Sequence, residues 1–188
     1  MEPVISSSPV STTTSTSSSS FSLRPAVKDD TDALVSLGIA TGLFSNEEAD
    51  LLLRSSLDNI FNGTDDPDTH IARVIVDSTS TLSAISSAPP LGWTYIVADP
   101  SNPAVWELYW IGVLPDTQRK GLGSLLLQDT ETIVKNKNGR MLLISTSSTD
   151  VTSKSRQFYI RQGYKEVGRI PDYYAPKDDK VIFWKGLE

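Results

Sequence analysis

This chain of 188 residues contains no cysteine and a single histidine, His70. The first absence excludes disulfide scaffolds, cysteine-ligated zinc and thiol nucleophiles. With one histidine, a site of several imidazoles cannot form, and a serine–histidine–aspartate hydrolase would have only His70 as its base. We predict no metal site. No apolar run approaches the roughly 20 residues that a membrane-spanning helix needs, so we expect no membrane partner.

Positive charge is also scarce, because 17 Lys and Arg residues face 23 Asp and Glu residues, for a net charge of -6. A protein that follows a phosphate backbone needs a basic face, so we expect no nucleic-acid partner. The hydrophobic share of 38% and the charged share of 21% are ordinary for a globular protein. A chain of this length suits one domain with a sizeable core.

The N-terminal segment has few apolar side chains that could drive folding. From Ser6 to Ser20, every residue except Pro9 and Val10 is Ser or Thr, so little apolar burial could offset the entropy lost on ordering. We predict a disordered Ser/Thr-rich tail over residues 1–20 and one domain over 21–188. Plastid transit peptides are also rich in hydroxyl groups but tend to carry Arg and lack acid. Here Glu2 comes early and the first Arg is Arg24, so a cytoplasmic location is favoured over a plastid or another organelle.

The remaining chain alternates strand-like and helix-like segments. Strands are predicted over residues 21–25, 71–77, 91–98, 105–114, 141–145 and 181–185. Helices are predicted from residue 29 to 37 and over 46–61, 121–136 and 153–162. Residues 169–180 are expected to form a loop before the last strand. This order predicts an α/β or α+β fold with a mixed sheet and helices on both of its faces.

The segment between the strand at 105–114 and the following helix is an expected anion site. It contains Gln118, Arg119, Lys120, Gly121, Leu122, Gly123 and Ser124. The first turn of a helix has unpaired N–H groups and a partial positive charge. Glycines keep side chains away from such a ligand, and the two basic residues add charge. A phosphate or diphosphate group is therefore expected here, although an ordinary Gly-rich turn would look similar.

The spacing of this loop excludes the better-known phosphate motifs. Lys120 precedes its Gly, unlike a P-loop, and Leu126 stands where a Rossmann fingerprint has its third Gly. The remaining pattern, Q-x-x-G-x-G after the strand E-L-Y-W-I-G-V-L-P-D, resembles the acyl-CoA-binding loop of the GCN5-related N-acetyltransferase (GNAT) superfamily. The resemblance extends to S-L-R-P-A-V-K-D-D at the start of the domain and to Phe158, Tyr159, Gly163 and Tyr164 near its end.

The resemblance implies a GNAT-like fold with its sheet splayed between two parallel strands, acetyl-CoA as cosubstrate and a set of site residues. The amides of Ile111, Gly112 and Val113 would polarise the thioester carbonyl. Many members carry an Asn that contacts the pantetheine arm. Here Thr152 stands at that position and Ser155 replaces the usual Ala, so the amide of that contact is lost.

Two residues are candidates for proton transfer. Glu107 is the only carboxylate of the apolar run 105–114, and strand alternation would put it on one face with Tyr109, Ile111 and Val113. The resemblance gives it the role of general base, whereas a carboxylate paired with an Arg would serve structure alone. Tyr159 would protonate the leaving thiolate, or else anchor its helix together with Phe158.

Weaker candidates remain open. His70 is expected in a surface loop, with a metal site or proton relay as the alternative. The aromatic residues of the central strands are expected mostly in the core, with one or two lining an acceptor pocket: Trp93, Tyr95, Trp106, Tyr109 and Trp110. Asp172, Tyr173 and Tyr174 would either contact the substrate or lie in a solvated loop.

These patterns predict an acetyltransferase that transfers acetyl from acetyl-CoA to a primary amine of a small molecule or amino acid. Transfer would be direct, because no cysteine exists to carry the acetyl group. Acetylation of a protein N-terminus or lysine is the alternative, and a non-catalytic acyl-CoA sensor is another. A homodimer is left open.

Overall fold

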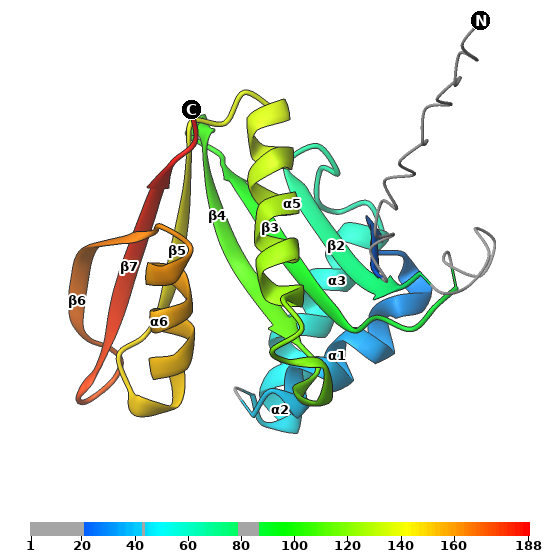
Figure 1. The fold of residues 1–188 in the computed structure, drawn as a ribbon, viewed down its shortest axis with the longest axis horizontal. Coiled ribbons are helices and arrows are strands. Elements are labelled where there is room, and N and C mark those ends of the chain that lie inside the picture. Colours follow the sequence, from blue (N-terminus) through cyan, green and yellow to red (C-terminus); the bar gives the residue numbers. More distant parts are fainter. Residues whose placement is uncertain (1–20, 43, 79–86) are drawn as a thin grey trace, which may run out of the picture.

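A seven-stranded mixed sheet forms the centre of the molecule (Figure 1). The computed structural model describes residues 21–42, 44–78 and 87–188, so the tail predicted over 1–20 lies outside it. The strand order is β1-β2-β3-β4-β5-β7-β6. In chain order the strands are Phe21–Pro25 (β1), His70–Asp77 (β2), Gly92–Asp99 (β3), Asn102–Val113 (β4), Met141–Ser147 (β5), Lys165–Ala175 (β6) and Asp178–Gly186 (β7).

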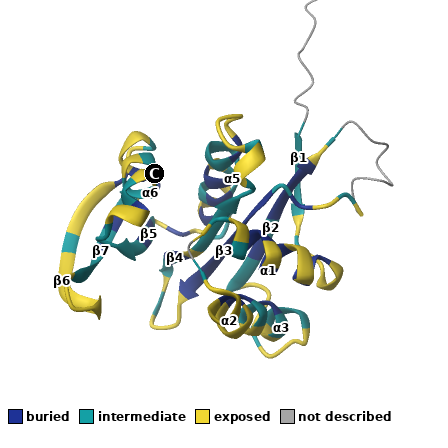
Figure 2. Cartoon of the chain, turned by 90° about the horizontal axis from the view of Figure 1, so that it is seen from below, coloured by how far each residue is buried: buried dark blue, intermediate teal, exposed yellow. Residues whose placement is uncertain are grey.

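Helices cover both faces of the sheet, as the sequence predicts. On one face lie α1 (Thr31–Ala40), α2 (Asn46–Glu48) and α3 (Ser55–Phe61), the last two joined by a π-helical segment, Ala49–Arg54. The other face carries α5 (Leu122–Asn136) and α6 (Ser153–Arg161). Figure 2 shows α1 to α3 below the β1–β4 half only, while no drawn helix lies below β5, β7 and β6. None of the described helices is both long and apolar enough to cross a membrane.

The sheet divides between β4 and β5, the one parallel pair among the described strands. These strands are paired from Val105 with Met141 to Leu108 with Ile144. Beyond that point β4 stays paired with β3 as far as Val113, and β5 stays with β7 as far as Ser147. The two strands therefore part like the arms of a V, which is visible in Figure 1. The fold is that of a sheet splayed between two parallel strands.

A β-bulge in β4 changes which side chains share a face. Tyr95 is paired with Trp110 while the next residue of β3, Ile96, is paired with Leu108, so Tyr109 is the extra residue. A bulge breaks the simple alternation of a strand. Before it, Leu108 packs in the core below α5; after it, Ile111 and Val113 do so. Strict alternation was therefore wrong for Glu107, which does not share a face with Ile111 and Val113.

The expected loop over residues 169–180 is also wrong, because β6 runs through to Ala175 and β7 begins at Asp178. Nearly every residue of β6 is exposed, so the strand shows no alternation of apolar and polar side chains. Pro171 and two register shifts interrupt it further. Such features are typical of an edge strand, and they hide it from a search for periodicity.

Candidate active site

The first turn of α5 presents unpaired backbone N–H groups. Gly121 precedes the helix with φ +80, a left-handed conformation that glycine adopts without strain. The first bond into the helix runs from the Leu125 N–H to the Gly121 carbonyl at 3.1 Å. The N–H groups of Leu122, Gly123 and Ser124 therefore have no acceptor within the helix. The turn contains no acidic residue, so an anion would meet no repulsion there.

The two glycines of this loop have different roles. A Cβ on Gly121 would meet nothing within 4 Å, so this position is open and needs glycine for its backbone conformation. A Cβ on Gly123 would lie 3.5 Å from the Phe158 ring, so this residue sits where α5 approaches α6. Gln118, Arg119 and Lys120 are exposed, and neither cation forms an ion pair within the described part of the chain.

The gap between β4 and β5 begins beside this turn. From Tyr109 to Val113, β4 has no partner strand on the side that faces β5, so part of its backbone edge, which includes Ile111, Gly112 and Val113, borders the gap. A Cβ on Gly112 would lie 3.0 Å from Leu37 in α1. This glycine thus lets α1 pack closely behind the strand that lines the gap.

Glu107 lies at the apex of the V. The Ser145 hydroxyl donates a hydrogen bond of 2.8 Å to its Oε1 atom, across the point where β4 and β5 begin to part. Glu107 also borders a small cavity of about 70 Å³ together with Val97, Asp99, Tyr109 and Leu143, among others. No Arg pairs with Glu107 among the described residues, so the alternative of a structural ion pair finds no support.

Two exposed tyrosines lie close enough to Glu107 to sense its charge. Burial raises the pKa of the Tyr109 phenol, and the charges of Glu107 and Asp99 raise it further. The pKa of Tyr174 is raised by burial, then by Tyr173, Asp178 and Glu107. Tyr109 comes from the bulge in β4 and Tyr174 from the irregular part of β6. The backbone irregularities that the sequence hides thus bring these two phenols within electrostatic reach of the carboxylate.

Tyr159 lies on the opposite face of the sheet from Glu107. It is 6% exposed and packs against Phe158, Tyr164 and Phe183, with its ring 5.6 Å from that of Phe183. Its hydroxyl has no hydrogen-bond partner within the described segments, and burial raises its pKa. The group is therefore protonated at neutral pH and has its proton available to a ligand. Its role as acid stays a prediction.

The turn between β5 and α6 contains a residue that the sequence analysis missed. Arg156 donates from Nη1 to the carbonyls of Ser147 (2.7 Å) and Thr149 (2.8 Å) and to the Thr152 hydroxyl (2.7 Å). That hydroxyl donates in turn to the Ser147 carbonyl at 2.7 Å. Thr152 is thus engaged with its own turn, while Ser155 lies half-buried in the first part of α6. The only available signal was an Arg one helical turn after Thr152.

His70 is the first residue of β2 rather than part of a surface loop, so that expectation was wrong. Its Nδ1 atom lies 2.7 Å from the Tyr95 hydroxyl and 3.4 Å from an Asp65 carboxylate oxygen. No group of three His, Asp or Glu side chains in the described segments could hold a metal ion. Of the five central aromatic residues, Trp93, Tyr95 and Trp106 are buried, as expected, whereas Tyr109 is 48% exposed.

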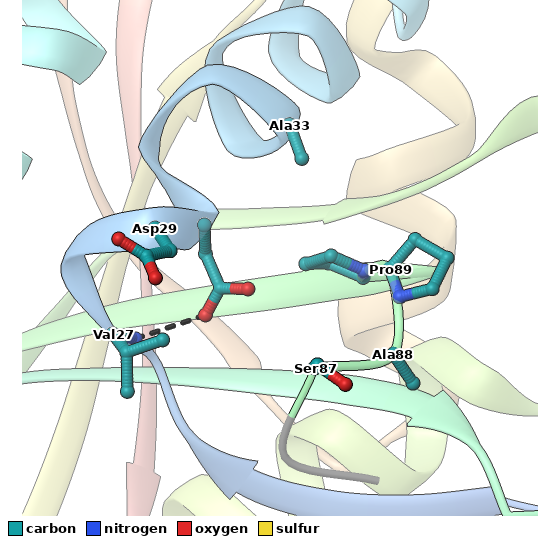
Figure 3. A pocket seen from close by; sticks show the side chains of 8 residues that line it. Val27, Asp29, Ala33, Ser87, Ala88 and Pro89 are labelled. Carbon is teal, nitrogen blue, oxygen red and sulfur yellow. Dashed lines mark hydrogen bonds between the residues drawn. The ribbon is translucent and has the colours of Figure 1, made fainter. Parts of the chain in front are cut away.

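A larger cavity of about 300 Å³ lies elsewhere, between the start of α1 and residues 87–90 (Figure 3). Val27, Asp29, Ala33 and Pro89 are among its lining residues. Asp30, which also borders it, is held by the Arg24 guanidinium at 2.7 Å and by the Val27 N–H at 2.9 Å. This cavity shares no lining residue with the one beside Glu107, and its carboxylate is already satisfied, so we do not place the active site there.

Comparisons with known proteins agree with this geometry. A family model described as "Acetyltransferase (GNAT) domain" matches residues 84–166. The family model covers less than half of the chain, and over this range the chain is similar to GNAT acetyltransferases. The match spans the parted strands, the loop before α5 and the turn that carries Arg156, so the family signal falls on the proposed site.

Solved structures of this family share the fold. A protein from Desulfovibrio desulfuricans described as a GNAT-family acetyltransferase superposes with TM-score 0.79 at 24% identity, over 89% of this chain and 99% of that one. An aminoglycoside 6'-N-acetyltransferase in complex with coenzyme A gives 0.64 at 16%, over 88% and 97%. A Salmonella typhimurium acetyltransferase with its cofactor acetyl-CoA gives 0.65 at 15%, over 90% and 95%.

Proposed function

We propose that this protein transfers the acetyl group of acetyl-CoA to a primary amine of a small molecule or amino acid. The observation that carries the proposal is the parting of β4 from β5, with Glu107 at its apex. Glu107 lies at the apex on one face, Tyr159 lies on the other, and the free amides of α5 lie beside the open end. Such an arrangement suits a thioester held between a base and an acid.

The cosubstrate fits the residues around the gap. The diphosphate of acetyl-CoA would accept hydrogen bonds from Leu122, Gly123 and Ser124 at the start of α5, where the helix dipole favours an anion. Arg119 and Lys120 would add charge at its rim. The pantetheine arm would lie in the gap, where it replaces the missing strand pairing along Ile111 to Val113. The Salmonella and aminoglycoside enzymes, which hold acetyl-CoA and coenzyme A, support this choice.

Starting from an ammonium group, the nitrogen must lose two protons and the thiolate must gain one, so one proton is released overall. The first proton leaves before the attack, and the second leaves to solvent as the tetrahedral intermediate collapses. Glu107 would accept the proton of the ammonium group, which frees the nitrogen lone pair to attack the thioester carbon. Backbone N–H groups of Ile111 to Val113 would donate to the carbonyl oxygen as charge develops there, and such donors need no reorganisation during the reaction. As the carbon–sulfur bond breaks, Tyr159 would give its proton to the sulfur.

A thiol-release assay with acetyl-CoA tests this function. We expect turnover with at least one member of a panel of amino acids, polyamines, arylamines and other small amines, and none with peptides alone. Turnover restricted to peptide N-termini or lysines would select the protein-directed alternative. Calorimetric binding of CoA without turnover on any amine would select a non-catalytic sensor. Absence of CoA binding would refute the proposal as a whole.

A further inference from the structure

We propose that the acceptor is a primary amine attached to an uncharged apolar body, and that this body lies on the open sheet face beside Glu107, over Leu143, Ile182 and Trp184. This inference rests on the proposed function, since it takes Glu107 as the position of the reacting nitrogen. It goes further in naming the chemical class of the acceptor.

Strand pairing places Glu107 and Trp184 in one line across the sheet. Glu107 is paired with Leu143 of β5, and Leu143 is paired with Trp184 of β7. Side chains directly opposite one another point to the same face. Because neighbouring strands lie about 4.8 Å apart, the Cα atoms of Glu107 and Trp184 lie about 10 Å apart on that face. An amine of modest size held at Glu107 would therefore extend over Leu143 to Trp184.

The floor of this region is apolar. In the next line across the sheet, Ser145 is paired with Ile182 and Ile182 with Gly168. Because Gly168 has no side chain, Ile182 lies over it, 3.7 Å from where a Cβ would be. Leu143, Ile182 and Trp184 are each only half-buried, and no drawn helix covers this side of β5 and β7 (Figure 2). The floor continues directly from Glu107, so its occupant and the reacting amine are expected to be one molecule.

The charges around Glu107 favour a cation without an adjacent carboxylate. Asp99 borders the same small cavity as Glu107, and no Lys or Arg does so. Tyr109 and Tyr174 lie within electrostatic reach of Glu107, and the face of an aromatic ring attracts an ammonium group. On this face of β5 and β7, Lys180 lies opposite Ser147, and its ammonium is already placed 4.8 Å over the Tyr173 ring. An amino acid would thus bring its carboxylate next to two acids.

The apolar floor also disfavours a second positive charge on the body. A terminal ammonium over Ile182 and Trp184 would lose water with only the Trp184 ring, and no acidic partner, to offset that loss, and such burial is costly. The proposal therefore separates three acceptors of similar length. They are 2-phenylethylamine, which fits, phenylalanine, which adds a carboxylate, and 1,6-diaminohexane, which adds an ammonium.

The test measures both turnover and binding. In the thiol-release assay, kcat/KM for 2-phenylethylamine is expected to exceed that for phenylalanine and for 1,6-diaminohexane by about tenfold or more, a difference typical of one mismatched group. Trp184→Ala is expected to raise KM for 2-phenylethylamine about tenfold with KM for acetyl-CoA unchanged. Trp184→Phe should restore most of the loss. Ile160→Ala, on an exposed aliphatic residue of α6, is the matched control and should change neither constant.

Calorimetry of the three amines with the CoA-saturated protein separates the two proposals. Preferred binding of 2-phenylethylamine without turnover would refute the proposed function and support the acceptor class. Turnover that is fastest with phenylalanine or the diamine, or a KM that Trp184→Ala leaves unchanged, would refute the acceptor class and keep the function. A protein that neither binds nor acetylates any of the three would refute the acceptor class, and the absence of turnover on the whole amine panel would then refute the proposed function.

Discussion

Glu107 is placed by backbone pairing on both of its sides, with β3 through Val97 and with β5 through Leu143. Among the described residues, its carboxylate has one hydrogen-bond partner, the Ser145 hydroxyl. We predict that Glu107→Gln lowers kcat by about 10²- to 10⁴-fold, the usual loss of a general base, with KM for acetyl-CoA unchanged. Steady-state kinetics against pH would measure this.

Ser145→Ala is the companion variant, because it removes the hydrogen bond but leaves the carboxylate. Its loss in kcat should be much smaller than that of Glu107→Gln. Equal losses of kcat in both variants would mean that the hydrogen bond between Ser145 and Glu107 has a structural role. Unchanged activity of Glu107→Gln would remove this residue from the mechanism.

Tyr159 differs from an ordinary surface tyrosine because burial raises its pKa above the usual value of 10.0. It therefore keeps its proton through neutral and mildly alkaline pH, which is what an acid needs. We predict that Tyr159→Phe slows turnover about 10- to 1000-fold, a range that overlaps typical acid catalysis. Tyr164→Phe is the control, because its hydroxyl donates to Glu131 at 3.0 Å and lies in a structural ion-pair network. That variant should lower the melting temperature and leave kcat near the wild-type value.

Residue identity alone indicates some of these groups and not others. Glu107 stands out in the sequence because a lone carboxylate interrupts an apolar run. Arg156 does not, since its role depends on three oxygens that converge only when β5 turns into α6. Tyr174 is likewise one of many exposed residues until the sheet brings it near Glu107.

At the scale of the element, an acidic residue at the start of α5 is expected to raise the stability of the CoA-free protein and to weaken CoA binding. An acidic side chain near a helix N-terminus stabilises the helix by about 0.3–1 kcal/mol, because it complements the helix dipole. Ser124→Asp should therefore raise the free energy of unfolding of the CoA-free protein. The same charge would repel the CoA diphosphate, so its dissociation constant should rise about tenfold, as expected for about 1.4 kcal/mol.

Urea unfolding and CoA calorimetry measure the two effects separately. Gln128→Glu is the matched control, since Gln128 is exposed on α5 but lies one turn beyond Ser124. It should change both quantities less. Tighter or unchanged CoA binding in Ser124→Asp would place the diphosphate somewhere else.

Most elements are predictable because their sequence signals are local. The Ser45–Glu48 capping box starts α2, and Gly163 ends α6 with φ +87, as the sequence indicates. The bulge at Tyr109 and strand β6 are not predictable in this way. A bulge depends on the register of two strands, and an edge strand exposed on both faces has no periodic pattern. Both irregular elements contribute a tyrosine within electrostatic reach of Glu107, so the proposed acceptor side is the part that the sequence predicts least.

At the scale of the whole molecule, each half of the sheet packs on helices of its own, and one core cluster also links the two halves. The β1–β4 half packs on α1 and α3 through residues such as Leu34, Leu57 and Trp93. The β5–β7 half packs with α6 through Tyr159, Tyr164 and Phe183. The halves are joined by four paired positions of β4 and β5 and by a core cluster that includes Leu108 of β4 and Leu142 of β5, and the gap lies beyond the paired positions. The mixed sheet follows from the element order, whereas the place where it opens depends on pairing that no local signal specifies.

Buried tyrosines also make the stability of the molecule sensitive to alkali. Burial raises the pKa of Tyr95, Tyr159 and Tyr164 above the ordinary value of 10.0, and nearby charges contribute for Tyr95 and Tyr164. Above pH 10 the unfolded chain releases these protons while the folded protein retains them. The unfolded state then binds fewer protons, so the free energy of unfolding falls as pH rises. The fall is about 1.4 kcal/mol per pH unit for each phenol that is ionised in the unfolded chain and still protonated in the folded protein.

We therefore predict that urea unfolding shows a loss of stability that begins near pH 10 and steepens above it. Lysines titrate in the same range, so the comparison with Tyr159→Phe isolates the contribution of one phenol. That variant should start less stable at pH 8, and its deficit should shrink as pH rises from 10 to 11, because it no longer has a proton to retain. A deficit that is constant over this range, or ionisation of all six tyrosines of the folded protein at pH 10, would show that the phenol is exposed to solvent and would weaken its assignment as a buried acid.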